Sequence, residues 1–399
     1  MIFRPDYIKA IEPFMGKPIV KILAGVRRCG KSTIFEMLKQ ELISRGVSGE
    51  NIIQRTYTDM DMPENITAKS MYDEITASMR GKKSCCLLLD EIQEIDGWEK
   101  AVNSLLENTN ADIYITGSNS KLMSAEISTY LTGRYVTIPV YTLSFKEYMA
   151  FKAESGRGGR ELLNEYIRFG GFPIIALAEY EADQAYQIVN GIYYTVVSRD
   201  IVKRHRIARQ DLFERVVKYI IENVGKTFSA NSISKFLKSE HRTVSVESIY
   251  NYIRWLEQAF IIYPCKRYDL QGKGILKTQE KYYLADMSLK YALLGYNRGM
   301  LDGAEENIVF LELKRRGYNV FIGKNGTKEI DFVARKGNEV IYIQSSYLLS
   351  DEKTREREFG NLQAIRNNYP KCVVSLDEWT SGSNVDGIKH IHLGEFLTM

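Results

Sequence analysis

The chain has 399 residues, 44% hydrophobic and 26% charged, with a formal net charge of +4, which is ordinary for a soluble globular protein. Its length exceeds one small core and indicates two to four structural units. No run approaches the ~18 consecutive apolar residues of a membrane span, so a membrane-spanning protein is not expected.

The first residues lack the apolar core of a signal peptide. The five cysteines include no C-x-x-C pair and indicate neither a disulfide framework nor a structural zinc site. We therefore expect a cytoplasmic protein.

Positive charge is concentrated in the middle of the chain. Residues 191–290 contain 18 Lys and Arg against 10 Asp and Glu, a local balance of +8, so the rest of the chain carries −4. A basic segment of this kind is typical of proteins with a polyanionic partner such as DNA. Solvated helix faces produce the same excess, and charge alone leaves both interpretations open.

The segment from Gly25 to Thr33 reads G-V-R-R-C-G-K-S-T, the pattern of a phosphate-binding loop. Its glycines permit backbone angles that turn successive N–H groups toward a phosphate. Its lysine reaches the β- and γ-phosphates, and its serine hydroxyl is a Mg²⁺ ligand. ATP and Mg²⁺ are the expected cofactors, and the predicted binding residues are Gly25, Val26, Arg27, Arg28, Cys29, Gly30, Lys31, Ser32 and Thr33.

The surroundings of the loop alternate between strand and helix. An apolar run at 18–24 leads into it, and residues 33–43 follow with helical spacing. Further strands are predicted at 51–57, 84–89, 111–116 and 135–140, and further helices at 68–79, 98–107 and 120–131. This alternation is typical of an α/β fold with a parallel sheet covered by helices on both faces.

Asp90 and Glu91 directly follow the apolar strand at 84–89. At the carboxyl end of a buried strand, an acid can hold Mg²⁺ and a following glutamate can polarise the attacking water. The plain alternative is a helix N-cap. A further strand inserted between the two motif-bearing strands is typical of nucleotidases with a catalytic glutamate, and we predict that Asp90 positions the metal while Glu91 is the base.

Two further polar positions are candidates for contact with the γ-phosphate. Asn119, with Ser118 beside it, closes the next strand and could sense the phosphate or orient the water, although a strand-end turn needs no such role. Arg134 could approach the γ-phosphate of a neighbouring subunit, which would make hydrolysis depend on assembly of a homo-oligomer. An arginine before a strand can equally be a solvated residue.

Taken together, these motifs resemble a family of bacterial and archaeal AAA-type ATPases whose C-terminal half is a domain of unknown function with restriction-endonuclease-like character. The resemblance covers nearly the whole chain and implies ATP binding and hydrolysis, but no particular substrate. Its marks are the phosphate-binding loop, Leu-Leu-Leu-Asp90-Glu-Ile-Gln-Glu-Ile-Asp-Gly-Trp98, Thr116-Gly-Ser-Asn-Ser, Leu-Thr-Gly-Arg134, Phe169-Gly-Gly-Phe-Pro173 and Ser198-Arg-Asp-Ile201.

Four domains are predicted on this basis. An AAA-type P-loop core occupies residues 1–155 and ends at a glycine-rich hinge, and a helical lid follows at 156–210. In the lid, Arg199 and Asp200 are interpreted as a structural salt bridge rather than a subunit contact. Residues 211–290 have the outline of a winged helix, and residues 291–399 that of a nuclease-like α/β core.

The winged helix would consist of helices at 211–224, 229–238 and 246–260 and a wing between strands 260–267 and 281–284. In such modules the third helix can enter the major groove and the wing can touch phosphates. Docking to another protein is the alternative use. The nucleic-acid candidates are Arg242, Ser248, Asn251, Arg254 and Lys273.

The nuclease-like region begins with an amphipathic helix at 303–316, followed by strands at 319–322, 329–333 and 339–344. A restriction-endonuclease fold holds Mg²⁺ with an acid on one strand and an acid-x-Lys motif on the next. Asp331 fits the first acid and Glu306 a helix acid, but Gln344 stands where acid-x-Lys should be. We therefore expect the fold in a degenerate form without efficient cleavage; Lys353 is a remote substitute for the missing lysine.

The leading interpretation is an oligomeric ATPase that converts ATP and water to ADP and phosphate. It would couple this hydrolysis to DNA binding or remodelling, and branched DNA is among the candidate partners. A signalling or defence switch that acts through protein–protein contacts is the alternative. An ATP-dependent DNA nuclease comes third because its third motif is damaged.

Overall fold

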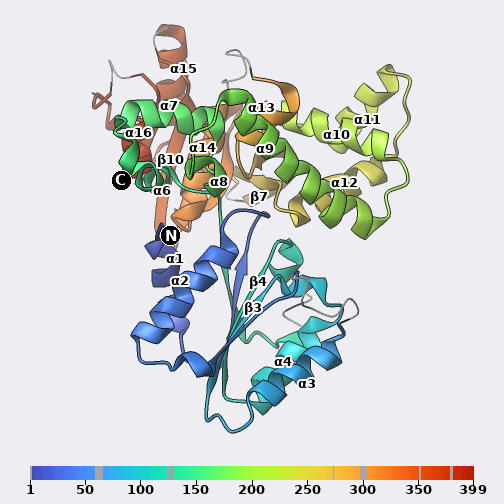
Figure 1. Cartoon of the computed structure of the whole chain (residues 1–399). Helices are drawn as coiled ribbons and strands as arrows, with labels where there is room; N and C mark the ends of the chain where they lie inside the picture. Colours follow the sequence, from blue (N-terminus) through green and yellow to red (C-terminus); the bar gives the residue numbers. More distant parts are fainter. Residues whose placement is uncertain are drawn as a thin grey trace. The chain divides into compact units, whose positions relative to one another are not determined.

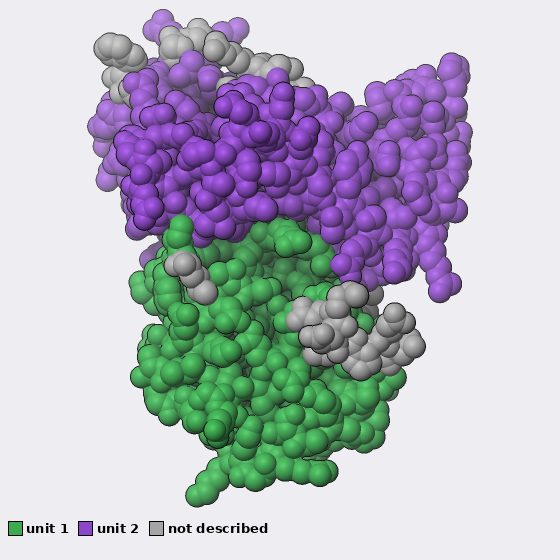
Figure 2. All heavy atoms as spheres, in the orientation of Figure 1, with its two compact units in different colours: residues 1–141, 258–260 green, residues 142–257, 261–399 purple. Residues whose placement is uncertain are grey.

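The structure, a computed structural model, describes residues 2–58, 66–123, 127, 130–272, 274–296, 303–349, 352–377 and 381–399. The chain forms two compact units (Figures 1 and 2). Unit 1 comprises residues 1–141 and 258–260, and unit 2 comprises residues 142–257 and 261–399. The division into four domains is finer than these two units and stays a prediction.

Unit 1 is built on a five-stranded parallel sheet. Its strands are β1 (Val20–Ala24), β2 (Ile52–Thr56), β3 (Cys85–Asp90), β4 (Ala111–Gly117) and β5 (Tyr135–Pro139), in the order β2-β3-β4-β1-β5. Every residue of β1 and β3 is buried, as expected for central strands covered on both faces. Since β4 lies between β1 and β3, an inserted strand separates the two motif-bearing strands.

Helices cover the two faces of this sheet (Figure 1). They are α1 (Pro5–Ile11), α2 (Lys31–Ser44), α3 (Ala68–Ser78) and α4 (Trp98–Asn108). Helix α2 lies on one side of the sheet and α3 and α4 on the other (Figure 1). Of the helix expected at 120–131, the structure describes a 3₁₀ turn, Ser120–Met123, and helical backbone at Ile127 and Tyr130.

Unit 2 begins with a run of helices. They are α6 (Phe145–Phe151), α7 (Gly159–Phe169), α8 (Pro173–Ala176), α9 (Ala182–Thr195), a π-helix (Val196–Lys203), α10 (Gln210–Glu222), α11 (Ala230–Ser239) and α12 (Val246–Gln258). The Gly170-Gly-Phe-Pro173 interruption separates α7 from α8 because proline is favoured at the first turn of a helix and disrupts its interior.

The strands of unit 2 form one eight-stranded mixed sheet, in the order β12-β13-β11-β10-β9-β8-β6-β7. They are β6 (Ile262–Asp269), β7 (Gly274–Leu284), β8 (Asn319–Asn325), β9 (Lys328–Lys336), β10 (Glu339–Ser346), β11 (Lys371–Ser375), β12 (Asn384–Val385) and β13 (Ile388–His392). The accompanying helices are α13 (Ser288–Leu294), α14 (Ala304–Arg315), α15 (Glu352–Gln363) and α16 (Leu393–Thr398).

Two features of this sheet differ from the sequence-based expectation. The hairpin assigned to the wing, β6 and β7, is also the edge of the C-terminal sheet, because β6 pairs in parallel with β8. Helix α14 was expected to be amphipathic but is buried from Asn307 through Leu313. It packs on several strands of the sheet, so its polar Asn307 bonds to the backbone of Leu284 instead of facing water.

Gly170 provides a test of packing in unit 2. Its φ is +75°, and a Cβ there would lie 1.7 Å from Asp286 Oδ1, a buried carboxylate that also accepts from the N–H of Gly171 at 2.8 Å. We expect Gly170→Ala to lower the free energy of unfolding by at least about 2 kcal/mol through strain and overpacking. The matched control is Gly191→Ala, at an exposed position of α9 with no heavy atom within 4 Å, which should stabilise by about 0.5–1 kcal/mol. Equal urea midpoints for the two variants would contradict this account.

Candidate functional site

The segment between β1 and α2 adopts the strained geometry that its sequence permits. A Cβ at Gly25 would lie 1.9 Å from the carbonyl oxygen of Val140, so only glycine fits. Arg28 and Gly30 both have positive φ, 68° and 99°. Gly30 is the N-cap residue of α2, which places the positive end of that helix at the loop.

Lys31 is the central cation of the loop. It is 3% exposed, and its Nζ donates to the carbonyl oxygens of Gly25 (3.1 Å) and Val26 (3.3 Å). It also lies 3.5 Å from Glu91 Oε1. The ammonium therefore lies inside the loop and close to the predicted base.

Asp90 ends β3, is 3% exposed, and is held from two sides. Its Oδ1 accepts from the hydroxyl of Thr116, and Ser32 forms a second side-chain hydrogen bond with it. Burial raises the pKa of Asp90, and the bonds from Thr116 and Ser32 act against this rise. The predicted metal ligands Ser32 and Asp90 are thus neighbours.

Glu91 is held in a left-handed backbone conformation, with φ of 53°. Its Oε2 accepts from Gln93 Nε2 at 2.5 Å and from Ser118 Oγ at 3.1 Å. Burial alone would raise the pKa of Glu91, but Lys31, Gln93 and other neighbours lower it below its usual value. The carboxylate is therefore ionised and already oriented in this state.

The structure distributes the two γ-phosphate candidates differently. Asn119 follows Ser118 at the end of β4 and is 3% exposed, on the same sheet edge as Glu91. Arg134 makes bonds within its own unit, from Nη2 to Glu107 Oε1 at 2.8 Å and to Asn103 Oδ1 at 3.1 Å. A role in a neighbouring subunit would require Arg134 to exchange these partners.

Three residues of this site were not predicted from the sequence. Gln93, in the 3₁₀ turn Ile92–Glu94 after β3, bonds to Glu91, and Thr116, near the end of β4, bonds to Asp90. Their closeness to the strand ends was the available signal. Arg4 is 2% exposed and donates to the carbonyl oxygens of Cys29 (2.8 Å) and Tyr141 (3.1 Å). It supports the loop from its buried side, a contact across 25 residues that local patterns do not indicate.

The nucleic-acid candidates lie on or before α12 in unit 2, except Lys273, which is outside the described residues. Arg242 pairs with Asp211 at 2.8 Å, and Ser248 N–H bonds to Ser245 Oγ at 3.0 Å as part of the helix start. Arg254 Nη2 donates to Asn251 Oδ1 at 2.8 Å.

Asn251 and Arg254 line a cleft that also contains acids and aromatic rings. The cleft is formed by Phe228, Ser229, Ala230, Asn231, Tyr250, Asn251, Ile253, Arg254, Glu257, Glu280 and Tyr282. Glu280 accepts from the hydroxyl of Tyr282 at 3.1 Å. Burial, with the Glu280 charge second, raises the pKa of Glu257 to about 7. The face predicted to meet DNA therefore includes negative as well as positive groups.

The raised pKa of Glu257 makes stability depend on pH. The folded protein binds a proton at Glu257 more tightly than the unfolded chain, whose value is near 4.5, so stability should fall as the pH rises from about 5 to 8. We expect Glu257→Gln to be more stable than wild type at pH 8, by on the order of 2 kcal/mol, with the difference vanishing below pH 5. Urea unfolding at both pH values tests this, with exposed Glu247→Gln of the same helix as control. A pH-independent difference would contradict it.

The degenerate nuclease candidates do meet in unit 2. Gln344 Oε1 accepts from the N–H of Asp331 at 2.7 Å, and Asp331 Oδ2 accepts from the N–H of Ser345 at 2.8 Å. Burial and the Glu306 charge raise the pKa of Asp331 well above its usual range. A residue that the sequence did not suggest, Lys281 of β7, lies 3.0 Å from Glu306 Oε1.

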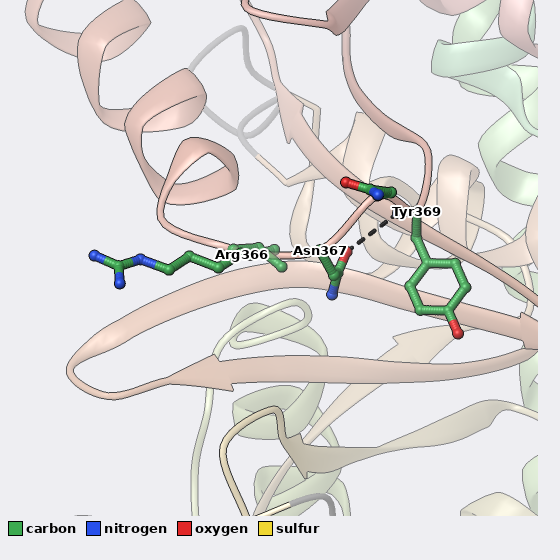
Figure 3. A pocket seen from close by; sticks show the side chains of 5 residues that line it. Arg366, Asn367 and Tyr369 are labelled. Atoms are coloured by element: carbon green, nitrogen blue, oxygen red, sulfur yellow. Dashed lines mark hydrogen bonds between the residues drawn. The ribbon is translucent and has the colours of Figure 1, made fainter.

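A surface hollow beside β11 is lined by a single loop. Residues 365–369 of one loop line it. Figure 3 shows Arg366, Asn367 and Tyr369 pointing in different directions, and the one hydrogen bond drawn joins Tyr369 N to Asn367 Oδ1 at 3.2 Å. These side chains do not converge on a common point, so the hollow has no candidate site.

The loop, the two acids at the end of β3 and the inserted strand are the features of a P-loop ATPase of the AAA type. Residues 17–149 match the model of an AAA domain, and residues 160–299 match a domain of unknown function (DUF8612). An uncharacterized protein of Haemophilus influenzae is 36% identical over the whole chain and 98% of its own length. One from Methanocaldococcus jannaschii is 32% identical over 93% of this chain and 86% of its own. The chain belongs to this AAA-type ATPase family.

Among solved structures, the chain is similar to a Walker-type ATPase of Pyrococcus abyssi, with 14% identity, a TM-score of 0.53, and coverage of 73% of this chain and 96% of that one. This likeness concerns the fold. It confirms the predicted α/β class, a P-loop ATPase sheet accompanied by a second α/β unit. Within the described ranges, no helix is both long and apolar enough to cross a bilayer.

Proposed function

We propose that this protein is a Mg²⁺-dependent ATPase that hydrolyses ATP to ADP and phosphate. The observation that carries the proposal is the convergence of Lys31, Asp90 and Glu91 on one sheet edge. Lys31 Nζ and Glu91 Oε1 are 3.5 Å apart, and Ser32 is a neighbour of Asp90. A cation for phosphate, a hydroxyl–carboxylate pair for the metal and a carboxylate base are the groups that the reaction needs.

Each residue then has a specific role. Lys31 and the N–H groups of residues 25–33 bind phosphate oxygens. Ser32 and Asp90 would hold Mg²⁺, which would supply positive charge to neutralise the phosphates. Glu91 accepts a proton from the attacking water, and Gln93 and Ser118 restrain it until then. Bound triphosphate would draw Lys31 away from Glu91 and leave the base free to contact water.

The gamma-phosphate roles of Asn119 and Arg134 belong to the same proposal. Asn119 orients the water or senses the phosphate from the end of β4. Arg134 acts in a homo-oligomer on the site of an adjacent subunit, after giving up Glu107. Its partly exposed position supports that exchange.

We further propose that ATP hydrolysis is coupled to DNA binding through unit 2. The local charge of +8 in residues 191–290 and the exposed Arg254 of α12 support this coupling. In this proposal residues 211–290 act as a winged helix, with Arg254 and Lys273 touching phosphates.

The coupling predicts salt-dependent retardation of DNA in gels. We expect a shift at low salt with duplex or branched DNA, with the slope of log K against log salt reduced by roughly 0.9 for each phosphate contact removed. Arg254→Ala/Lys273→Ala should lose the shift, and DNA should raise ATP turnover in wild type only. Lys69→Ala, at an exposed ion pair of α3, is the matched control. No shift at low salt would contradict DNA coupling while leaving the ATPase proposal intact.

One observation favours a second candidate function, a switch that acts through protein contacts. Glu257 and Glu280 line the cleft beside Arg254, and carboxylates there would repel DNA phosphates. A protein partner with basic side chains would suit the cleft better. Absence of DNA binding together with ATP-dependent change of assembly state would support this candidate.

A further inference from the structure

A buried lysine joins three elements of unit 2. Lys281 of β7 has a side chain 7% exposed, and its Nζ lies 3.0 Å from Glu306 Oε1 of α14 and 3.0 Å from Glu329 Oε1 of β9. The hydroxyl of Tyr283 donates to the same Glu306 oxygen at 2.6 Å. We refer to Lys281, Glu306, Glu329 and Asp331 as the lysine cluster.

The cluster contains two of the three residues that the nuclease-like resemblance assigns to metal binding, Glu306 and Asp331, and the third, Gln344, adjoins it through Asp331. Those residues do not fit a divalent ion. Glu306 is engaged by Lys281 and Tyr283. Gln344 is neutral: its Oε1 accepts from the N–H of Asp331, and its Nε2 donates a hydrogen bond to Glu358 Oε2.

The remaining acid is also engaged within the chain. Asp331 Oδ2 accepts from the N–H of Ser345 at 2.8 Å. In the ranges that the structure describes, no group of three or more His, Cys, Asp or Glu side chains is arranged to hold a metal ion. The donors that a metal would need are therefore directed to other partners.

Carboxylates that are partly removed from water need a compensating positive charge. A lysine ammonium is a compact point charge with three N–H donors, which suits a site with several carboxylate oxygens. Burial alone would lower the pKa of Lys281, but the charges of Glu306, Asp331 and Glu329 raise it. The two carboxylate oxygens that lie 3.0 Å from Lys281 Nζ thus compensate the buried ammonium.

We propose that Lys281 is the resident cation of the lysine cluster and takes the place that a divalent metal ion would occupy in a nuclease-like domain. Lys281 then keeps the domain in a metal-free form. It comes from β7, whereas the missing acid-x-Lys motif would lie on β10. It does not cleave nucleic acid by a metal-dependent route. The proposal does not depend on the ATPase function, because every residue of the cluster belongs to unit 2.

The experiment counts Mn²⁺ ions bound by the full-length, nucleotide-free protein, using electron paramagnetic resonance. Lys281→Met removes the charge and keeps most of the side-chain length, so it leaves Glu306 and Asp331 without this cation, whereas Glu329 keeps Arg267 at 3.6 Å. We expect this variant to bind one additional Mn²⁺ per chain, and Asp331→Asn in the same background to abolish that gain. Lys281→Arg keeps the charge and should bind as wild type does. Mn²⁺ bound elsewhere cancels in these comparisons.

A folded Lys281→Met variant without additional Mn²⁺ would overturn the proposal. If that variant does not fold, wild type and Asp331→Asn decide the question: equal Mn²⁺ counts support the proposal, and a lower count in Asp331→Asn overturns it. Cleavage of DNA by wild type with Mn²⁺, abolished by Asp331→Asn, would also overturn it.

Discussion

Glu91→Gln should bind ATP with nearly wild-type affinity but hydrolyse it 10²–10⁴-fold more slowly, the range that a general base contributes. Glutamine keeps the shape of the side chain and can still bond to Ser118, so the loop and Lys31 stay in place. It has no carboxylate to accept the proton of the attacking water. The defect should therefore appear in kcat, and the Kd for ATP should change little.

The measurement combines phosphate release under saturating ATP with equilibrium binding of a fluorescent ATP analogue. Glu94→Gln is the matched control, because Glu94 lies in the same turn and pairs with Arg27 at 3.6 Å but has no proposed role with water. Hydrolysis by Glu91→Gln at the wild-type rate would rule out Glu91 as the base.

Lys31→Ala should have the opposite signature and lose ATP binding itself. The substitution removes the only ammonium that the proposal assigns to the β- and γ-phosphates. A hydrogen bond to a charged group contributes about 1.5–3 kcal/mol, so we expect the affinity for ATP to fall by roughly 10- to 100-fold. The effect on AMP should be much smaller, because AMP lacks both of those phosphates.

Titration of ATP, ADP and AMP against the same variant tests this expectation. Lys9→Ala is the control, since Lys9 is an exposed lysine of unit 1 paired with Asp6. Circular dichroism excludes unfolding as the cause. An equal loss of affinity for all three nucleotides would mean that Lys31 acts through the fold of the loop and not through its charge.

The parts of this site that local sequence could predict are those whose signal is contiguous. Gly25 and Lys31 lie in one short run, and Glu91 directly follows an apolar strand. Chain geometry forces such residues to their positions, since a buried parallel strand ends at the edge where ligands bind. The α/β class followed from the same alternation of apolar strands and helices.

The parts that could not be predicted depend on contacts between distant segments. Arg4 reaches Cys29 and Tyr141 only after the sheet has formed. Lys281 enters the lysine cluster because β6 pairs with β8 and brings the hairpin into the C-terminal sheet. No periodicity in residues 260–290 indicates that pairing. The sequence therefore suggested that the nuclease-like domain lacks a lysine, because only the acid-x-Lys position on the strand at 339–344 was considered.

The most direct test of the central proposition is a crystal structure with a non-hydrolysable ATP analogue and Mg²⁺. We predict that the triphosphate lies in the loop of residues 25–33, with Lys31 Nζ within hydrogen-bonding distance of the β- and γ-phosphate oxygens. Ser32 and Asp90 should adjoin the metal, and Glu91 should face the γ-phosphate. An empty loop, or nucleotide bound away from Asp90 and Glu91, would contradict the proposed function.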